Sequence, residues 1–332
     1  MLKKVKLGDA NVTAVAYGCM GLSQAYEACD EGQGIRTLNA VLDMGYDHLD
    51  TAALYGFGKN EELLNKAIGH RRSEYFLASK CGLYRDSTGK REINGRPEVL
   101  TKTCEDSLRR LGTDCIDLYY LHRIDLNVPV EDSIGALMNM RDQGKIRFIG
   151  LSEPSPETLE KALNLCQIAA VQSELSLWTR SPNDTVADIC GRKGIAFVSY
   201  SPLGRGFFGG KVRDTAVLTE KDIRHTMPRF QADNFASNLK RLDELSALAE
   251  ENGITVAQLA LAWVMAQGDH ILAIPGTRFE DRARENLDAA RSLLTDEVIA
   301  HAGRIVSPES TAGERWTETI LREVDSEQNR FR

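Results

Sequence analysis

The stretch LDTAALYGFG (49–58) ends a short apolar run at Asp50 and places Tyr55 five residues later. Two further runs, FLASK (76–80) and IDLYYLH (116–122), end at Lys80 and His122. Each run is short and rich in apolar, β-branched or aromatic residues, which is typical of buried strands in a parallel sheet. In each case a polar residue stands where the strand gives way to a loop. The alternation of strand, loop and helix that these runs begin predicts the fold.

Eight runs of this kind alternate with segments of helical periodicity. The predicted strands are Ala14–Tyr17, Tyr46–Leu49, Tyr75–Ser79, Ile116–Leu121, Ile146–Leu151, Ala169–Gln172, Ile195–Tyr200 and Ile271–Ile274. The predicted helices between them are Ile35–Met44, Glu61–Ile68, Pro97–Leu111, Glu131–Gln143, Pro156–Cys166, Asn183–Arg192 and Val256–Met265. Glycines at 45, 112, 144, 194 and 253 follow helical segments, as helix stop signals do.

This pattern predicts a single domain over residues 1–332, an α/β fold of the (β/α)8 TIM barrel type with an N-terminal β-hairpin and two extra helices. A doubly wound sheet split into two domains is the competing arrangement, but there are eight strands and no low-complexity hinge. Residues 203–235 form a long insertion rich in Gly, Arg and Thr, and loops of this length are usually lids or binding loops. A helix over Asn238–Glu251 follows. The polar tail, about 307–332, is expected either to wrap the barrel or to be disordered.

The composition limits the classes of function. The 332 residues are 42% hydrophobic and carry a formal charge of −7, so no basic surface for nucleic acid is expected. Seven cysteines form no C-x-x-C pair and no Cys/His cluster at zinc-ligand spacing, which argues against a metal site and for a reducing, cytoplasmic location. We expect no secretion signal and no membrane span, because no run of about 18 apolar residues occurs. Whether the protein is a monomer or a homo-oligomer stays open.

Four polar side chains are expected to meet at one rim of the barrel, because the carboxyl ends of its strands gather there. Hydride that reaches a carbonyl carbon leaves an alkoxide, and Tyr55 can supply the proton as a general acid. Lys80 can stabilise the tyrosinate, and Asp50 can pair with the lysine ammonium, whose burial would otherwise be costly. Neutral His122 can donate a hydrogen bond to the substrate oxygen. Taken singly, each could be a structural ion pair or a core histidine.

The chain resembles the aldo-keto reductase family. The similar segments are LDTAALYG (49–56), SK (79–80), DLYYLH (117–122), GKIRFIGLSE (144–153), VQSELSLW (171–178), YSPLGRG (200–206) and IPGTR…REN (274–286). SELSLWTR, SPLGRGFF and TMPRFQ are similar to the branch that holds plant perakine-reductase-like and microbial enzymes. The resemblance implies an oxidoreductase that reduces aldehydes, with ketones as further candidates, to alcohols with NADP(H). It assigns the family's catalytic residues to Asp50, Tyr55, Lys80 and His122.

The resemblance also implies a cofactor site. The expected contacts are Gly276, Thr277, Arg278 and Arg282 to the adenosine 2′-phosphate, and Glu285 and Asn286 to the adenine. Ser152 and Gln172 would bind the nicotinamide carboxamide, Tyr200 would stack on the nicotinamide ring, Ser201, Leu203, Gly204 and Arg205 would lie near the pyrophosphate, and Met20 and Asp50 near the ribose or nicotinamide. Many relatives carry a lysine at the position of Gly276, which leaves the phosphate to the two arginines. The alternative is a solvated helix face on which these arginines pair with acidic neighbours.

Two short motifs are typical of other dehydrogenase folds. GRGFFG (204–209) matches the dinucleotide pattern G-x-G-x-x-G, but no helix opens after it and no acidic residue ends a second strand about twenty residues on. The resemblance reads it as the start of a loop that covers the cofactor. Tyr55 and Lys59 copy the spacing of short-chain dehydrogenases, which requires a helix, and Gly56 and Gly58 argue against one.

The substrate side of the site is less determined. Trp178, Tyr84, Arg123, Phe207 and Phe208 are expected to line an apolar cavity for a small carbonyl substrate. Many relatives have an aromatic residue at the position of Arg123, which either pairs with Asp125 or favours a polar substrate. Two other functions stay open, a Schiff-base lyase that uses Lys80 and a regulatory cofactor-binding barrel of the same family.

Overall fold

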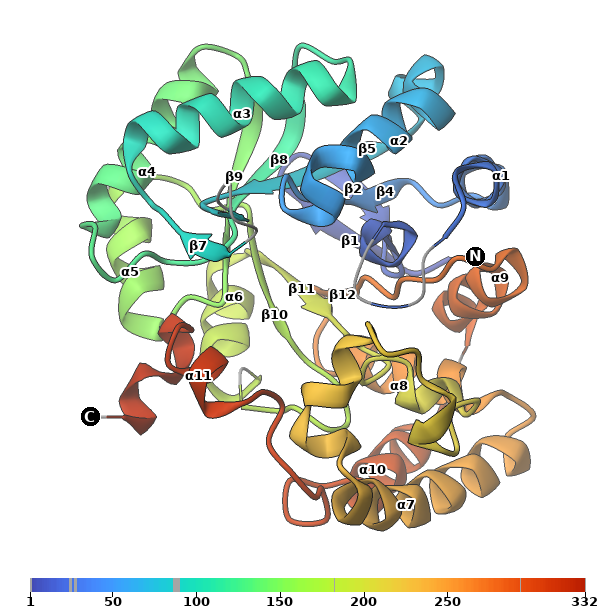
Figure 1. Cartoon of the computed structure of the whole chain (residues 1–332). Helices are drawn as coiled ribbons and strands as arrows, with labels where there is room; N and C mark the ends of the chain where they lie inside the picture. Colours follow the sequence, from blue (N-terminus) through green and yellow to red (C-terminus); the bar gives the residue numbers. More distant parts are fainter. Residues whose placement is uncertain are drawn as a thin grey trace.

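The computed structural model describes residues 2–23, 26, 29–85, 90–181, 183–292 and 294–331. Its central sheet is parallel, with the strand order β12-β11-β10-β9-β8-β5-β4-β3 (Figure 1). A parallel bridge between Val15 and Ala273 joins the two edges, so the sheet closes into a barrel and the predicted (β/α)8 fold is confirmed. The strands are β3 (Tyr17–Gly18), β4 (His48–Asp50), β5 (Phe76–Cys81), β8 (Ile116–Leu121), β9 (Ile146–Ser152), β10 (Ala170–Glu174), β11 (Ala196–Tyr200) and β12 (Ile271–Ala273).

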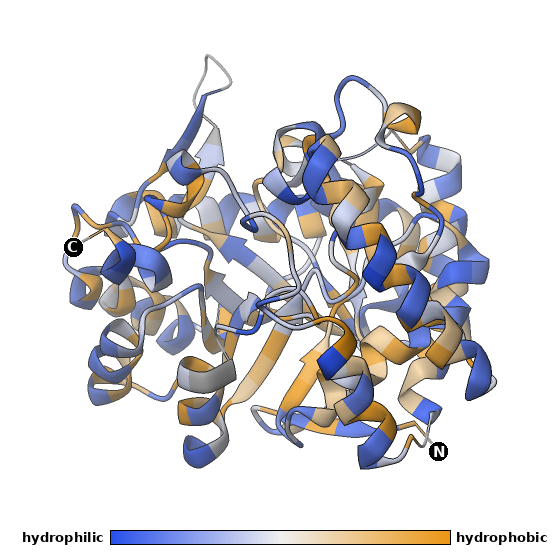
Figure 2. Cartoon of the chain, turned by 90° about the horizontal axis from the view of Figure 1, so that it is seen from below, coloured by the Kyte–Doolittle hydropathy of each residue, from blue (hydrophilic) through white to orange (hydrophobic). Residues whose placement is uncertain are grey.

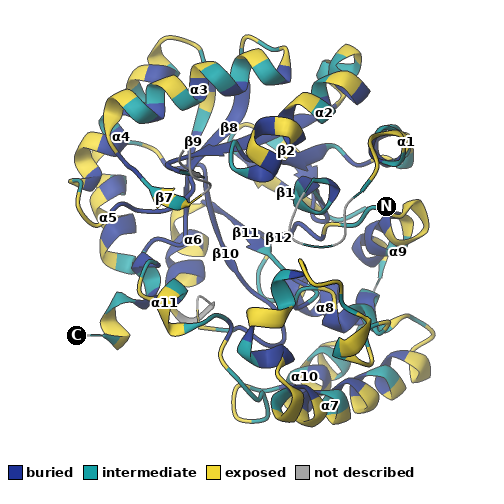
Figure 3. Cartoon of the chain, viewed as in Figure 1, coloured by how far each residue is buried: buried dark blue, intermediate teal, exposed yellow. Residues whose placement is uncertain are grey.

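Helices surround the barrel and bury one face each. The barrel strands are buried almost throughout, with Arg147 of β9 as an exposed exception, while most helices have an exposed outer side (Figure 3). Seen from below, apolar residues gather in the strands and on the inner helix faces (Figure 2). The helices that follow the strands are α1 (Glu31–Met44), α2 (Lys59–Ile68), α3 (Pro97–Leu111), α4 (Val130–Asp142), α5 (Pro156–Leu165), α6 (Asp188–Lys193), α8 (Val256–Ala266) and α9 (Glu280–Asp288). Every predicted helix is present, with boundaries that shift by a few residues at most sites.

Two extra helices cover α8. Its sequence, VAQLALAWVMA, is apolar on nearly all sides, so its outer face also needs cover. That cover comes from α7 (Ala232–Glu251) and α10 (Asp296–Ile305), which pack against it. Helix α7 begins at Ala232 rather than at the predicted Asn238, because its first turn is anchored by the buried Phe235, whose N–H donates to the Gln231 carbonyl at 2.7 Å. The long insertion therefore ends at residue 231.

Two hairpins lie at opposite ends of the barrel. The predicted N-terminal hairpin, β1 (Lys4–Leu7) with β2 (Ala10–Thr13), covers the amino ends of the strands, where the Thr13 N–H donates to Asp47 at 2.8 Å. A second hairpin, β6 (Leu83–Arg85) with β7 (Arg91–Ile93), follows β5 at the carboxyl ends and was not predicted. Leu83 of β6 and Arg91 of β7 line the cavity described below.

The C-terminal tail packs on the rim at the carboxyl ends of the strands. In Figure 1 it runs from α10 towards α5 and includes α11 (Glu318–Leu321) and a 3₁₀ turn (Asp325–Arg330). Buried Arg315 donates to both carboxylate oxygens of Glu153, at 3.0 and 2.9 Å, and to Glu327. Asp325 accepts the N–H of Ser155, the N-cap of α5, at 2.6 Å. The tail is therefore part of the wall of the barrel mouth.

Candidate active site

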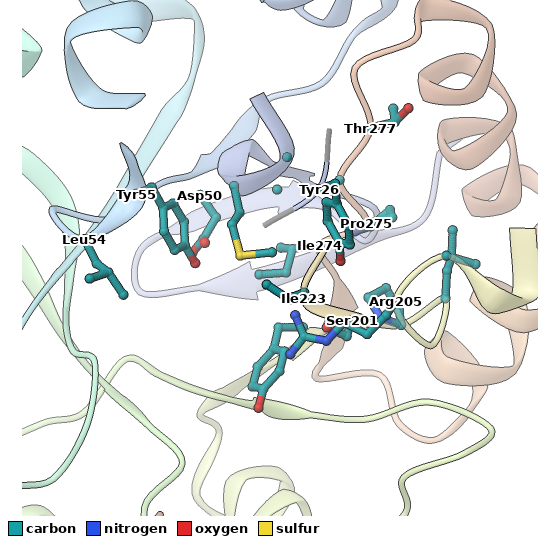
Figure 4. A pocket seen from close by; sticks show the side chains of 18 of the residues that line it. Tyr26, Asp50, Leu54, Tyr55, Ser201, Arg205, Ile223, Ile274, Pro275 and Thr277 are labelled. Atoms are coloured by element: carbon teal, nitrogen blue, oxygen red, sulfur yellow. The ribbon is translucent and has the colours of Figure 1, made fainter. Parts of the chain in front are cut away.

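The four predicted catalytic residues come together at the barrel mouth. Asp50 ends β4, Lys80 lies next to the end of β5, and His122 directly follows β8. Tyr55 opens the 3₁₀ turn Tyr55–Gly58, which carries it back over the rim. All four are buried, with Lys80 fully enclosed. Figure 4 shows the side chains of Tyr55 and Asp50 side by side on one wall of the cavity.

Lys80 is the centre of their hydrogen-bond network. Its Nζ is paired with Oδ1 of Asp50, donates to the Thr51 carbonyl at 2.8 Å and lies 3.4 Å from the Tyr55 hydroxyl. The other carboxylate oxygen of Asp50 accepts from the Gln172 amide at 2.8 Å. The buried ammonium is thus fully compensated, which is the arrangement that burial of a charge requires.

The electrostatics set a protonation state for each group. Burial raises the pKa of Tyr55, and the Lys80 charge only partly lowers it, so the phenol keeps its proton at neutral pH. Burial alone would lower the pKa of Lys80, but the charge of Asp50 outweighs it and the pKa lies above the ordinary value. Burial, followed by the charges of Lys80 and Arg123, holds the pKa of His122 well below its usual range. The site therefore contains a protonated phenol, an ammonium and a neutral imidazole.

A cavity of about 540 Å³ extends from these residues to the N-terminus of α9. Fourteen of the predicted site residues line it: Met20, Asp50, Tyr55, His122, Ser152, Gln172, Tyr200, Ser201, Leu203, Arg205, Gly276, Thr277, Arg278 and Arg282. Lys80 lies behind Tyr55 and Asp50. Gly204, Glu285 and Asn286 are outside the lining, and Asn286 is buried in α9.

The far end of the cavity carries the two predicted phosphate-binding arginines. The guanidinium carbons of Arg278 and Arg282 lie 5.1 and 4.8 Å from the ring centre of Phe279, the residue before α9. A helix N-terminus with arginines beside it is suited to an anion. Gly276 approaches β3 so closely that a Cβ there would lie 2.6 Å from the Gly18 carbonyl oxygen. The close backbone contact explains why this position holds a glycine.

Arg205 occupies the middle of the cavity wall. Its guanidinium carbon lies 5.5 Å from the ring centre of Tyr200 and 4.6 Å from that of Trp316, on the tail. Its backbone has a positive φ of 58°, which is uncommon for a residue other than glycine. Figure 4 shows it beside Ser201, on the wall formed by the loop after β11. Arg205 therefore stands next to the ring that was predicted to stack on nicotinamide.

The prediction that Trp178, Phe207 and Phe208 line the substrate cavity is wrong. The rings of Trp178 and Phe207 stack at 4.1 Å and all three residues are buried in the core. Aromatic clusters of this kind bury a large apolar area, and here the cluster, which includes Phe230, fastens the loop after β11 to the barrel. Tyr84 also lies outside the lining, and its neighbour Leu83 is in it.

Other lining residues were missed by sequence reasoning. They are mainly Tyr26, Arg91, Ile223, Arg224, Trp316 and Ile320. Trp316 and Ile320 are among the few apolar residues of the tail, with Leu321, Val324 and Phe331, and this is the local signal that could have marked them. The remainder reach the cavity only through long-range packing.

The two short motifs behave as expected. GRGFFG contains the 3₁₀ turn Phe207–Gly209 and no helix follows it directly. Tyr55 precedes α2, which begins at Lys59, and Gly56 and Phe57 have positive φ, so Tyr55 and Lys59 do not share a helix face.

Within the described ranges, no group of three or more His, Cys, Asp or Glu side chains could hold a metal ion. Across that same part of the chain, every helix is too short or too polar to cross a bilayer.

Comparison with known proteins agrees with this geometry. The sequence model of the Aldo/keto reductase family matches residues 14–306. The chain is 38% identical over 319 residues to "Probable aldo-keto reductase 1" of Glycine max, covering 95% of this chain and 92% of that protein. It is 38% identical over 317 residues to "Aldo-keto reductase yakc [NADP(+)]" of Schizosaccharomyces pombe, covering 94% and 93%.

Solved structures give the same result. The glycerol dehydrogenase AKR11B4 from Gluconobacter oxydans superimposes with a TM-score of 0.84 at 30% identity, covering 92% of this chain and 96% of that one. An aldo/keto reductase from Klebsiella pneumoniae in complex with NADP and acetate gives a TM-score of 0.72 at 28% identity, covering 95% and 99%. The predicted resemblance is confirmed, and the chain belongs to the aldo/keto reductase family.

Proposed function

We propose that this protein reduces aldehydes, and ketones as a second class, to alcohols with NADPH, and that Tyr55 is the general acid. The observation that carries the proposal is the protonated Tyr55 hydroxyl at the cavity wall, 3.4 Å from the Lys80 ammonium that Asp50 neutralises. His122, neutral and on the same wall, can hold the carbonyl oxygen.

The described residues fit an NADP(H) molecule. The cavity joins the Tyr55 site to Arg278 and Arg282, so one elongated ligand can reach both. The relative from Schizosaccharomyces pombe is named for NADP(+), and the Klebsiella pneumoniae structure contains NADP. When bound, the cofactor supplies the hydride. Charge-assisted bonds from Arg278 and Arg282 would hold the 2′-phosphate, and Gly276 leaves room for close backbone approach.

Each catalytic side chain has a distinct task in this scheme. The Tyr55 hydroxyl donates its proton to the carbonyl oxygen as negative charge develops there. Lys80 stabilises the resulting tyrosinate, and Asp50 keeps Lys80 charged and in place. His122 orients the carbonyl by hydrogen bonding. General acid catalysis of this kind typically contributes about 10²–10⁴-fold in rate.

We expect Arg205 to move when the cofactor binds. If nicotinamide stacks on Tyr200 as expected, it needs the ring face over which the Arg205 guanidinium now lies. We propose that Arg205 turns to the cofactor pyrophosphate, where its charge is better compensated.

The alternative functions have less support. A Schiff-base lysine must be neutral and accessible. Lys80 is instead fully buried and paired with Asp50, and its pKa is raised. A regulatory barrel would not need all four of Asp50, Tyr55, Lys80 and His122. In this chain all four are present and lie together.

The test is a turnover assay with purified protein, NADPH and a panel of aldehydes, ketones and pyridoxal. We expect NADPH consumption matched by alcohol formation for at least one class, with much slower turnover with NADH. No consumption of NADPH with any carbonyl compound would contradict the proposal. A borohydride-trapped substrate adduct on Lys80 without nicotinamide would support the lyase instead.

A further inference from the structure

Arg123 is a buried cation next to the reaction site for which the described structure provides no counter-ion. It follows His122, is 8% exposed and lines the same cavity. One terminal nitrogen, Nη1, donates to the His122 carbonyl at 2.7 Å and lies 3.3 Å from the Ser152 hydroxyl. Its Nε is buried and has no hydrogen-bond partner in the described part of the chain. Among the described residues, no carboxylate lies within 4.0 Å of this guanidinium. A buried charge left in this state is costly.

Asp125, two residues after Arg123 in the chain, is occupied by other partners. Asp125 accepts the Gly95 N–H at 2.9 Å on one oxygen, and the N–H of Asn127 at 2.9 Å on the other. It shapes the loop after β8 and does not pair with Arg123, which settles the question that the sequence left open.

Glu153 is occupied as well. Its Oε1 accepts from Arg315 and from the Glu174 N–H, each at 3.0 Å. Its Oε2 accepts from Arg315 at 2.9 Å and from Ser326 at 2.8 Å. Arg315 is the main cause of the lowered pKa of Glu153, to which the charge of Arg123 adds, and the hydrogen bonds of the carboxylate are used in holding the tail.

The second arginine of this part of the cavity differs from Arg123. Arg91, on β7, is ion-paired with Glu323 of the tail at 2.6 Å. Its charge is therefore compensated within the protein. After burial and the charge of Lys80, the charges of both arginines also lower the pKa of His122, as positive charge close to an imidazole does. Lys80 is paired with Asp50 and Arg91 with Glu323. Arg123 is therefore the positive charge that remains available to a ligand.

We propose that Arg123 binds a carboxylate of the substrate, so that the preferred substrates are carbonyl compounds that also carry a carboxylate group. A guanidinium matches a carboxylate through two parallel N–H···O bonds, and such bonds are strongest where water is excluded. This inference rests on the proposed function, because it concerns the same cavity. It adds a specificity-determining residue and a substrate class to it.

Matched substrates test the proposal. The probes are 3- and 4-carboxybenzaldehyde and their methyl esters, which differ in charge and little in the reacting group. With NADPH, the wild-type protein should show a kcat/KM at least 10-fold higher for one acid than for its ester. The variant Arg123→Gln should lose roughly 10- to 100-fold on the acid and change little on the ester. Arg91→Gln is the matched control for long-range charge, and its loss on the acid should be much smaller.

Each outcome is distinguishable from failure of the proposed function. Reduction of both esters and acids without preference would overturn the carboxylate inference and leave the reductase intact. An equal loss for Arg123→Gln on acid and ester, with a raised KM for NADPH, would assign Arg123 to the cofactor and also overturn it.

Binding gives a readout that does not depend on turnover. Benzoate is titrated into the protein with bound NADPH, and it should bind at least 10-fold more weakly to Arg123→Gln than to the wild type. Benzamide, which has no charge, should bind to both proteins with the same affinity. Equal benzoate affinity for both proteins would refute the inference.

Discussion

At the scale of residues, the proposed chemistry depends on compensation of buried charge. Asp50 neutralises Lys80, and Lys80 lies close enough to Tyr55 to stabilise the tyrosinate. That these residues lie together could be predicted, because unusual residue types stand at successive strand ends, where a barrel gathers them. The donation from Gln172 to Asp50 could not be predicted, because it joins residues 122 positions apart and leaves no local pattern.

Cofactor choice should depend on Arg278 and Arg282. Well-formed bonds from each to a 2′-phosphate are worth roughly 1.5–3 kcal/mol. Replacement of both by Ala is therefore expected to weaken NADPH binding strongly and NADH binding little, as measured by titration of each cofactor. Arg284→Ala, an exposed change on the same helix outside the cavity lining, should leave both affinities unchanged. Equal affinity of the wild type for the two cofactors would refute the assignment.

Acid sensitivity should depend in part on His48. The residue is fully buried in β4 and packs against Phe76, and neither ring nitrogen has a hydrogen-bond partner among the residues that the structure describes. Burial lowers its pKa, with Asp50 acting in the opposite direction. The unfolded chain therefore binds the proton more readily, so stability is full above the unfolded pKa of about 6.5 and is lost as the pH falls through it.

We expect the free energy of unfolding in urea to fall between pH 7.5 and 5.5, by at most about 1.4 kcal/mol per pH unit for one histidine. His48→Leu should reduce this fall, and His122, also lowered in pKa, should account for part of the remainder. An identical fall in wild type and variant would show that His48 has no part in it.

At the scale of elements, the loop after β11 is fixed at its two ends and more exposed between them. Phe207 and Phe208 anchor its start in the aromatic cluster, and Phe230 anchors its end before α7. Residues between them are largely exposed, for example Val217 at 69%. The glycine content and weak periodicity of residues 203–235 predicted a lid. They could not show whether the rings of Phe207 and Phe208 anchor this loop or line a pocket.

This loop is expected to close over the cofactor. Its exposed middle part, about 211–226, should exchange amide hydrogens quickly in the cofactor-free protein and more slowly with NADPH, because closing orders it. The barrel strands should change little and serve as the internal control. High protection that does not rise on NADPH addition would mean that the loop is a fixed wall.

At the scale of the whole molecule, the tail completes the cavity. Trp316 and Ile320 line it, and the Arg315 pair with Glu153 holds the tail to the rim across 162 residues. The barrel itself could be predicted because each strand and helix carries its own periodicity. The position of the tail could not be predicted, because its buried residues, such as Arg315 and Asp325, are held by partners far away in the chain.

Arg315→Met should release the tail. Removal of one partner leaves Glu153 buried and uncompensated, which typically costs about 3–5 kcal/mol. We expect faster proteolysis and hydrogen exchange over residues 307–331 and a higher KM for substrate, while the barrel stays folded. The control is Arg322→Met, which removes an exposed pair with Glu318 and should have little effect. An equally protected tail in both variants would contradict this role.

The role of Tyr55 as proton donor is the central claim, and Tyr55→Phe tests it most directly. The phenyl ring keeps the shape of the site and removes only the hydroxyl that faces Lys80. We predict a loss of about 10²–10⁴-fold in the rate of carbonyl reduction, with NADPH affinity nearly unchanged. Tyr75→Phe, at the opposite end of β5, should keep full activity. A Tyr55→Phe protein that retains more than a tenth of the wild-type turnover would contradict the account.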